Sequence, residues 1–79
     1  MTTSESIEAS LRAGLDCHHV QVAGDGQHFE ALIVSSEFEG LSRIGRHQRV
    51  YAALGDRMRE EIHALSMTTL TPAEWDARR

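Results

Sequence analysis

The dipeptide Asp25-Gly26 constrains the fold of this chain more than any other feature. Both residues tolerate the positive φ angles that a tight hairpin turn requires. Before the turn, Val20 and Val22 alternate with more polar or smaller residues, and after it the segment 28–34 is almost continuously apolar. This pattern predicts two antiparallel strands joined by a tight turn. The second strand, being the more apolar, is expected in the centre of the sheet.

Helical periodicity comes before the hairpin. The apolar residues of segment 2–15 recur on one helical face: Ile7, Leu11 and Leu15. Thr2 and Glu5 have the spacing of a capping box, in which a hydroxyl and a carboxylate satisfy the first free backbone N–H groups of a helix. The sequence therefore predicts a short amphipathic helix that packs on the sheet.

A second helix is predicted from about residue 42 to residue 62, after a polar connection. Its expected apolar face consists of Ile44, Tyr51, Leu54, Met58 and Ile62. Val50 falls at the margin of this face. Gly55 costs about 1 kcal/mol relative to alanine inside a helix and is a candidate break into two helices.

The last part of the chain predicts a strand and a short helix. Segment 63–70 has the alternation and threonine content of a strand. Thr71 is a good N-cap, Pro72 suits the first helical position, and Glu74 completes a capping box. The order helix, strand, strand, helix, strand, helix predicts a two-layer α/β sandwich (α+β), with helices covering a three-stranded sheet. Residues 1–79 are expected to form a single domain.

Composition narrows the classes of function. The net charge of −4 opposes non-specific nucleic-acid binding, although all eight cationic side chains are arginines. The single cysteine, Cys17, cannot form an internal disulfide, which suits a reducing compartment. No apolar run approaches the roughly 20 residues of a membrane span, and no export signal is evident. We therefore expect a soluble, cytoplasmic protein.

Several motifs in register resemble the BolA-like family. They occupy residues 28–40, 46–51, 62–65 and 69–75. The short hairpin and compact length are most similar to the IbaG branch of its bacterial members. The resemblance implies a fold like the class II KH domain, in which the first two strands are antiparallel and the third is added in parallel, so that the sheet is mixed.

The resemblance also implies a function in iron–sulfur cluster assembly or trafficking, or in iron and stress sensing. BolA-like proteins pair with monothiol glutaredoxins of the CGFS type and share a [2Fe–2S] cluster with them. The glutaredoxin supplies its cysteine and the thiol of a bound glutathione, so no cluster is expected in the isolated chain. The BolA-like partner supplies a histidine just before its last strand, which His63 matches. Position alone also allows His63 to cap the carbonyls that end the preceding helix.

The second cluster ligand is where this chain departs from the family pattern. Family members with a loop cysteine have it at the position of Asp25, and the loop 24–27 contains no cysteine or histidine. A carboxylate is a poor ligand for iron in such a cluster. His28, at the edge of the strand, is the remaining candidate. Either the cluster geometry differs here, or association with the glutaredoxin is largely independent of the cluster.

Three arginines support an alternative function. Arg43, Arg46 and Arg49 recur every three residues and are expected on one helical face, where they could bind DNA phosphates. A solvated helix face is the simpler interpretation. The Gly-x-x-Gly loop with which KH domains clamp nucleic acid is missing. A nucleic-acid-binding transcriptional regulator therefore stays the alternative to the glutaredoxin partner.

The remaining candidate is the run Cys17-His18-His19. Neighbouring side chains of a strand point to opposite faces, so these three cannot easily converge on one metal ion. The sequence also lacks a phosphate-binding glycine-rich loop, a His-Glu-x-x-His helix and a nucleophile elbow. We therefore expect a non-catalytic protein, and the free chain is compatible with a weak homodimer.

Overall fold

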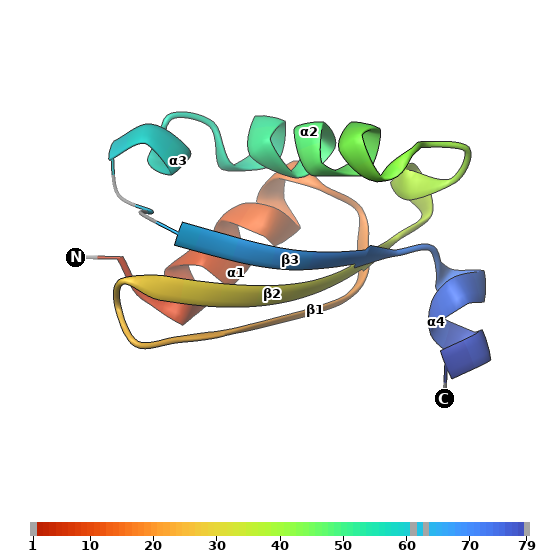
Figure 1. Cartoon of the computed structure of the whole chain (residues 1–79), viewed down its shortest axis with the longest axis horizontal. Coiled ribbons are helices and arrows are strands. Elements are labelled where there is room, and N and C mark those ends of the chain that lie inside the picture. The colour runs from red at the N-terminus through yellow and green to blue at the C-terminus, as the bar shows by residue number, and fades with distance from the viewer. Residues whose placement is uncertain (1, 61, 63, 79) are drawn as a thin grey trace.

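The computed structural model describes residues 2–60, 62 and 64–78. Helices and strands follow the predicted order (Figure 1). The elements are α1 (Ser4–Gly14), β1 (Cys17–Gly24), β2 (His28–Ser35), the 3-10 helix η1 (Ser36–Phe38), α2 (Arg43–Leu54), α3 (Arg57–Glu60), β3 (Ala64–Leu70) and α4 (Pro72–Arg78). The one predicted helix over 42–62 is thus two helices, α2 and α3, separated at Gly55, whose φ of 61° ends α2.

The sheet is mixed, with β2 in the centre and the strand order β1-β2-β3. β1 and β2 are antiparallel, whereas β2 and β3 are parallel, as the family resemblance implied. Asp25 and Gly26 form the hairpin turn: the Asp25 carboxylate accepts the backbone N–H groups of Gln27 and His28, at 2.9 and 2.8 Å, and Gly26 has a φ of 99°.

The main core lies between the sheet and the helices α1 and α2, which cover the same face (Figure 1). Its buried residues come from both helices, from β1 and β2, and from the connections: Ile7, Leu11, Leu15, Val20, Phe29, Ala31, Ile33, Phe38, Val50, Leu54 and Ile62. Burying apolar side chains stabilises the fold by roughly 25 cal/mol per Å². The predicted two-layer arrangement follows from this core.

The apolar face of α2 differs from the prediction. Val50, expected at the margin, is fully buried, while Ile44 and Tyr51, expected in the core, are 71% and 42% exposed. The buried face instead includes Ala53, which packs closely against Gly14 of α1. Small residues occupy the face where two helix backbones approach each other. A prediction based on the large apolar side chains of a helix does not find this face.

The helix caps are partly as predicted. The capping box of α1 uses Thr3 and Ser6 instead of Thr2 and Glu5: the Ser6 N–H donates to the Thr3 hydroxyl at 3.1 Å, and the Thr3 N–H donates to the Ser6 hydroxyl at 3.3 Å. A serine hydroxyl serves in place of a carboxylate, and the helix begins one residue later. The cap of α4 is confirmed, because Thr71 and Glu74 exchange bonds of 2.8 and 3.2 Å.

The C-terminal helix α4 contacts β2 and β3 at the end of the sheet where β3 finishes (Figure 1). His19 of β1 stacks on Trp75 of α4, with ring centroids 4.9 Å apart and planes 15° apart. Because Val20 faces the main core, strand alternation directs His19 to the opposite face of the sheet. Trp75 thus ties α4 to the face that α1 and α2 leave uncovered. Within the described residues, no helix is both long and apolar enough to cross a membrane.

Candidate functional site

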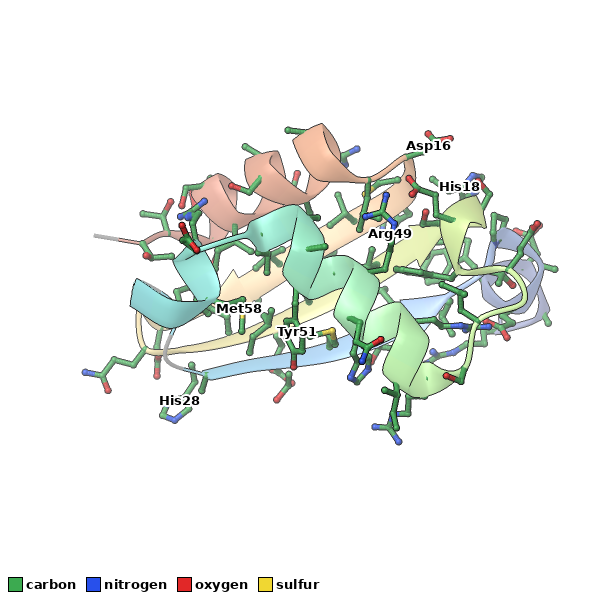
Figure 2. The ribbon with its side chains drawn as sticks, turned by 90° about the horizontal axis from the view of Figure 1, so that it is seen from above. Asp16, His18, His28, Arg49, Tyr51 and Met58 are labelled. Carbon is green, nitrogen blue, oxygen red and sulfur yellow. The ribbon has the colours of Figure 1, made fainter. Side chains whose placement is uncertain are left out.

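His28 lies exposed at the start of β2, at the end of the sheet that carries the hairpin turn. Figure 2 shows it at the opposite end of the molecule from Asp16 and His18. Its backbone N–H donates to the Asp25 carboxylate, and its Cα pairs across the sheet with Ala64, the first residue of β3. The backbone of His28 is therefore held by the turn on one side and by the parallel pairing with β3 on the other.

An open hollow of about 390 Å³ lies beside His28. It is lined by Ala23, Gly24, Asp25, His28, Phe29, Glu30, Ala64 and Ser66. The small side chains at this end of the three strands leave space beside the imidazole. A bulky group held by another molecule can therefore approach His28 here.

Asp25 has a structural task at this site. Its carboxylate oxygen accepts two backbone N–H groups of the turn, and these bonds, first that of His28 and then that of Gln27, hold the pKa of Asp25 below its ordinary value. A carboxylate bound in this way stabilises the hairpin.

The other predicted ligand, His63, lies outside the described residues. Its two neighbours in the sequence are held by contacts within the fold. Ile62 is buried in the core, with its N–H donating to the Arg57 carbonyl at 2.9 Å, and Ala64 pairs with His28. No group of three or more histidine, cysteine, aspartate or glutamate side chains within the described residues could hold a metal ion.

Cys17 is remote from His28, at the other end of β1. Its thiol donates to the Leu11 carbonyl at 3.7 Å, and burial raises the pKa of Cys17 above its ordinary value. His18 is exposed, whereas His19 is stacked on Trp75. The three adjacent side chains have separate surroundings, in keeping with the prediction that they do not converge on one metal ion.

The three arginines of α2 do not present a common free face. Arg46 forms a bidentate pair with Glu74 of α4, at 2.7 and 3.3 Å, and also donates to the carbonyls of Leu41 and Thr69. The Arg46 bonds, followed by that of the Thr71 N–H, lower the pKa of Glu74 from 4.5 to about 2. Arg46, the central arginine of the alternative phosphate-binding face, thus holds α2, β3 and α4 together.

Arg49 is likewise bound within the fold. It pairs with Glu37 of η1, and Figure 2 shows it on the opposite side of α2 from Tyr51. Glu37 also accepts the Asp16 N–H at 2.6 Å, and that bond, together with Arg49, lowers the pKa of Glu37. Sequence spacing placed these arginines near one another but gave no sign of their carboxylate partners, which lie 12 and 28 residues away.

Known proteins are similar to this chain both in sequence and in fold. A family model described as BolA-like protein matches residues 5–74. The acid stress protein IbaG of Escherichia coli strain K12 is 38% identical over 73 residues, which are 91% of this chain and 87% of the relative. A BolA homologue of known structure from Coxiella burnetii superposes with a TM-score of 0.87 at 43% identity, covering 96% of this chain and 99% of that one.

A further relative has a name that concerns nucleic acid. The DNA-binding transcriptional regulator BolA of Haemophilus influenzae is 39% identical over 61 residues, which are 77% of this chain and 58% of the relative. These relatives are named as a stress protein and a regulator, and neither name describes an enzyme.

Proposed function

The chain belongs to the BolA-like family, and we propose that it is a non-catalytic partner of a monothiol glutaredoxin that helps to ligate a bridging [2Fe–2S] cluster. The observation that carries the proposal is the position of His28. Its imidazole is exposed beside an open hollow, and its backbone is fixed by Asp25 and by pairing with Ala64. His63, which immediately precedes Ala64 in the sequence, is the other proposed ligand.

The donor set of the chain supports a shared cluster. The only sulfur that could serve as a thiolate ligand belongs to Cys17, which is half-buried, bonded to Leu11 and remote from the hollow. The lining of the hollow offers one imidazole, that of His28, and carboxylates that are poor ligands for such iron. Thiolates must therefore come from another molecule, and the glutaredoxin cysteine and glutathione have that chemistry.

Histidine ligation would give such a cluster properties that four thiolates do not. Imidazole nitrogen in place of a thiolate raises the reduction potential of a [2Fe–2S] cluster. The nitrogen must be unprotonated to bind iron, so the affinity falls at acidic pH. In this account the chain binds, orients its imidazoles and leaves space beside them, and it supplies no catalytic step.

Reconstitution with a monothiol glutaredoxin and glutathione tests the proposal. Visible absorption and circular dichroism of the mixture are expected to differ from those of the glutaredoxin homodimer with its own cluster. His63→Ala and His28→Ala should each reduce or shift that difference, and the double variant should remove it. His18→Ala is the matched control, because His18 is an exposed histidine at the opposite end of the molecule.

Two results would contradict the proposal. One is a mixture whose spectrum equals that of the glutaredoxin homodimer alone. The other is a heterodimer spectrum that stays unchanged in His63→Ala and in the double variant with His28→Ala. Cluster-free binding measured by calorimetry would then leave only a docking role.

Nucleic-acid binding is the second candidate, favoured by the name of the Haemophilus relative. The ion pairs of Arg46 and Arg49 argue against nucleic-acid binding, because a side chain bound to a carboxylate contributes little to phosphate binding. If the chain binds DNA through these arginines, a filter-binding assay should give a steep loss of affinity with salt. A weak response that is flat across salt concentrations would exclude this function.

A further inference from the structure

The outer edge of β3 pairs with no other strand among the described residues, and the Arg46 side chain donates to one β3 carbonyl, that of Thr69, at 3.1 Å. The strand order leaves β1 and β3 at the two edges of the sheet. β1 has an irregular register between Cys17 and His19, a device that discourages pairing with another strand. β3, from Ala64 to Leu70, contains no charged residue, proline or glycine. Among the described residues, no backbone group outside the sheet forms a hydrogen bond to the backbone of β3.

A hollow of about 340 Å³ lies between this edge and the start of α2. Its lining carries two guanidinium groups, those of Arg43 and Arg46, and its other residues are Leu41, His47, Met67, Thr68 and Thr69. None of these described lining residues is a carboxylate. Three of the lining residues belong to β3, and two of these are threonines, which are common in strands and suit further pairing.

An exposed stripe of α2 continues the hollow. Ile44, His47 and Tyr51 are three and four residues apart and so follow one side of the helix. Ile44 is 71% exposed and Tyr51 is 42% exposed. Figure 2 shows Tyr51 on the side of α2 that lies toward β3. Apolar side chains thus border the free strand edge, where they could cover side chains of an added strand.

The charge of the hollow differs from that of the whole chain. The net charge of the protein is −4, yet the hollow presents the guanidinium groups of Arg43 and Arg46. Arg46 already binds Glu74, but no carboxylate of the described residues forms an ion pair with Arg43. A guanidinium with no such partner favours a bidentate bond to a carboxylate from another molecule.

We propose that the outer edge of β3, the hollow and the Ile44–Tyr51 stripe bind an extended acidic segment of a partner protein, which adds to the sheet as a fourth strand. Main-chain hydrogen bonds to an edge give such complexes their affinity, and side-chain pockets give them specificity. The inference goes beyond the proposed cluster function. The hollow contacts Met67 to Thr69, whereas His28 pairs with Ala64 at the other end of β3, so both sites could be occupied together.

Other occupants fit these observations less well. Single-stranded nucleic acid needs cationic side chains along its backbone and stacking platforms for its bases. Here Arg46 and Arg49 are neutralised, and Tyr51 is the one aromatic side chain of α2. A second copy of this chain would bring the same lining, which contains no carboxylate to bind Arg43. A carboxylate-bearing peptide matches both Arg43 and the unpaired edge of β3.

Fluorescence anisotropy on the isolated chain tests the inference. The probe is a labelled six-residue peptide that alternates valine with aspartate, blocked at both ends. We expect it to bind, with amide chemical shifts changing in β3 and in the first turns of α2 and not in β1. Arg43→Glu should weaken binding about tenfold, the value of one charge-assisted hydrogen bond. A carboxylate near the start of a helix is favourable, so this variant should fold.

Matched controls separate charge from edge pairing. Arg12→Glu makes the same change in net charge on α1 and should bind the peptide like the wild type. The same peptide methylated on alternate backbone nitrogens keeps its charges but cannot pair as a strand, so it should not bind. A peptide that alternates valine with lysine should not bind either.

Three outcomes would overturn the inference. Equal binding of the methylated and unmethylated peptides would mean that no strand is added. Oligothymidine that binds at the same residues more tightly than the peptide would assign the hollow to nucleic acid. A dimer in sedimentation whose interface maps to β3 and excludes the peptide would assign the edge to a second copy.

Discussion

The contact between α1 and α2 yields a quantitative prediction at Gly14. A Cβ atom added at Gly14 would lie 2.7 Å from the Ala53 Cβ and 2.9 Å from the Ala53 Cα. Favourable carbon–carbon contacts are at about 3.5–4.0 Å, so one of the two helices would have to move. Overpacking of this kind costs about 1–3 kcal/mol.

Helix propensity acts in the opposite direction. Alanine is favoured over glycine by up to about 1 kcal/mol within a helix. The difference predicts that Gly14→Ala lowers the free energy of unfolding by about 0–2 kcal/mol. For a domain of this size, that corresponds to a fall in Tm of up to roughly 16 °C. Urea and thermal unfolding, followed by circular dichroism, measure both quantities.

Two further variants make the test specific. Gly45→Ala is the matched control: its new Cβ would lie 3.4 Å from the Ser42 hydroxyl, an ordinary contact, so the substitution should leave stability unchanged or raise it. Ala53→Gly in the Gly14→Ala background removes the clashing Cβ and should cost less than the sum of the single changes. If Gly14→Ala stabilises the protein as much as Gly45→Ala does, the close approach of α1 and α2 is wrong.

Three other predictions follow from single contacts. The pKa of Glu74 is lowered from 4.5 to about 2, so its ion pair contributes stability that is fully present above the ordinary pKa and is lost as the pH falls toward 2. Glu74→Gln should therefore reduce the loss of stability between pH 5 and pH 2, as measured by urea unfolding at each pH. The raised pKa of Cys17 should make its alkylation by iodoacetamide at neutral pH slower than in the denatured chain, and equal rates would contradict its burial. Leu54→Ala should cost about 2–5 kcal/mol and Ile44→Ala less than about 0.5 kcal/mol in urea unfolding, whereas equal costs would support the helix face predicted from the sequence.

Much of the fold follows from local sequence signals. The Asp25 turn is specified by its own side chain, and the cap of α4 by Thr71 and Glu74, because each device involves residues only two or three positions apart. The break at Gly55 is of the same kind. The parallel addition of β3 was implied by the family resemblance, since periodicity alone does not specify the direction of a strand.

The sequence predictions that differ from the structure depend on contacts between residues far apart in the sequence. The buried face of α2 is set by Ala53 meeting Gly14, a packing that the size of neighbouring side chains does not reveal. Arg46 was assigned to a free helical face because its partner, Glu74, is 28 residues away. For the candidate site, His28 was a candidate from the sequence alone, but the sequence could not indicate the open hollow beside it, which lies where one end of each of the three strands meets the others.

Pulsed electron paramagnetic resonance of the reduced cluster, in the complex with glutaredoxin, tests most directly whether this chain supplies a nitrogen ligand. We expect a strongly coupled ¹⁴N signal from imidazole in the wild type. The signal should weaken in His63→Ala and in His28→Ala, be lost when both are replaced, and be kept in His18→Ala. A wild-type cluster without any strongly coupled nitrogen would contradict histidine ligation by this chain.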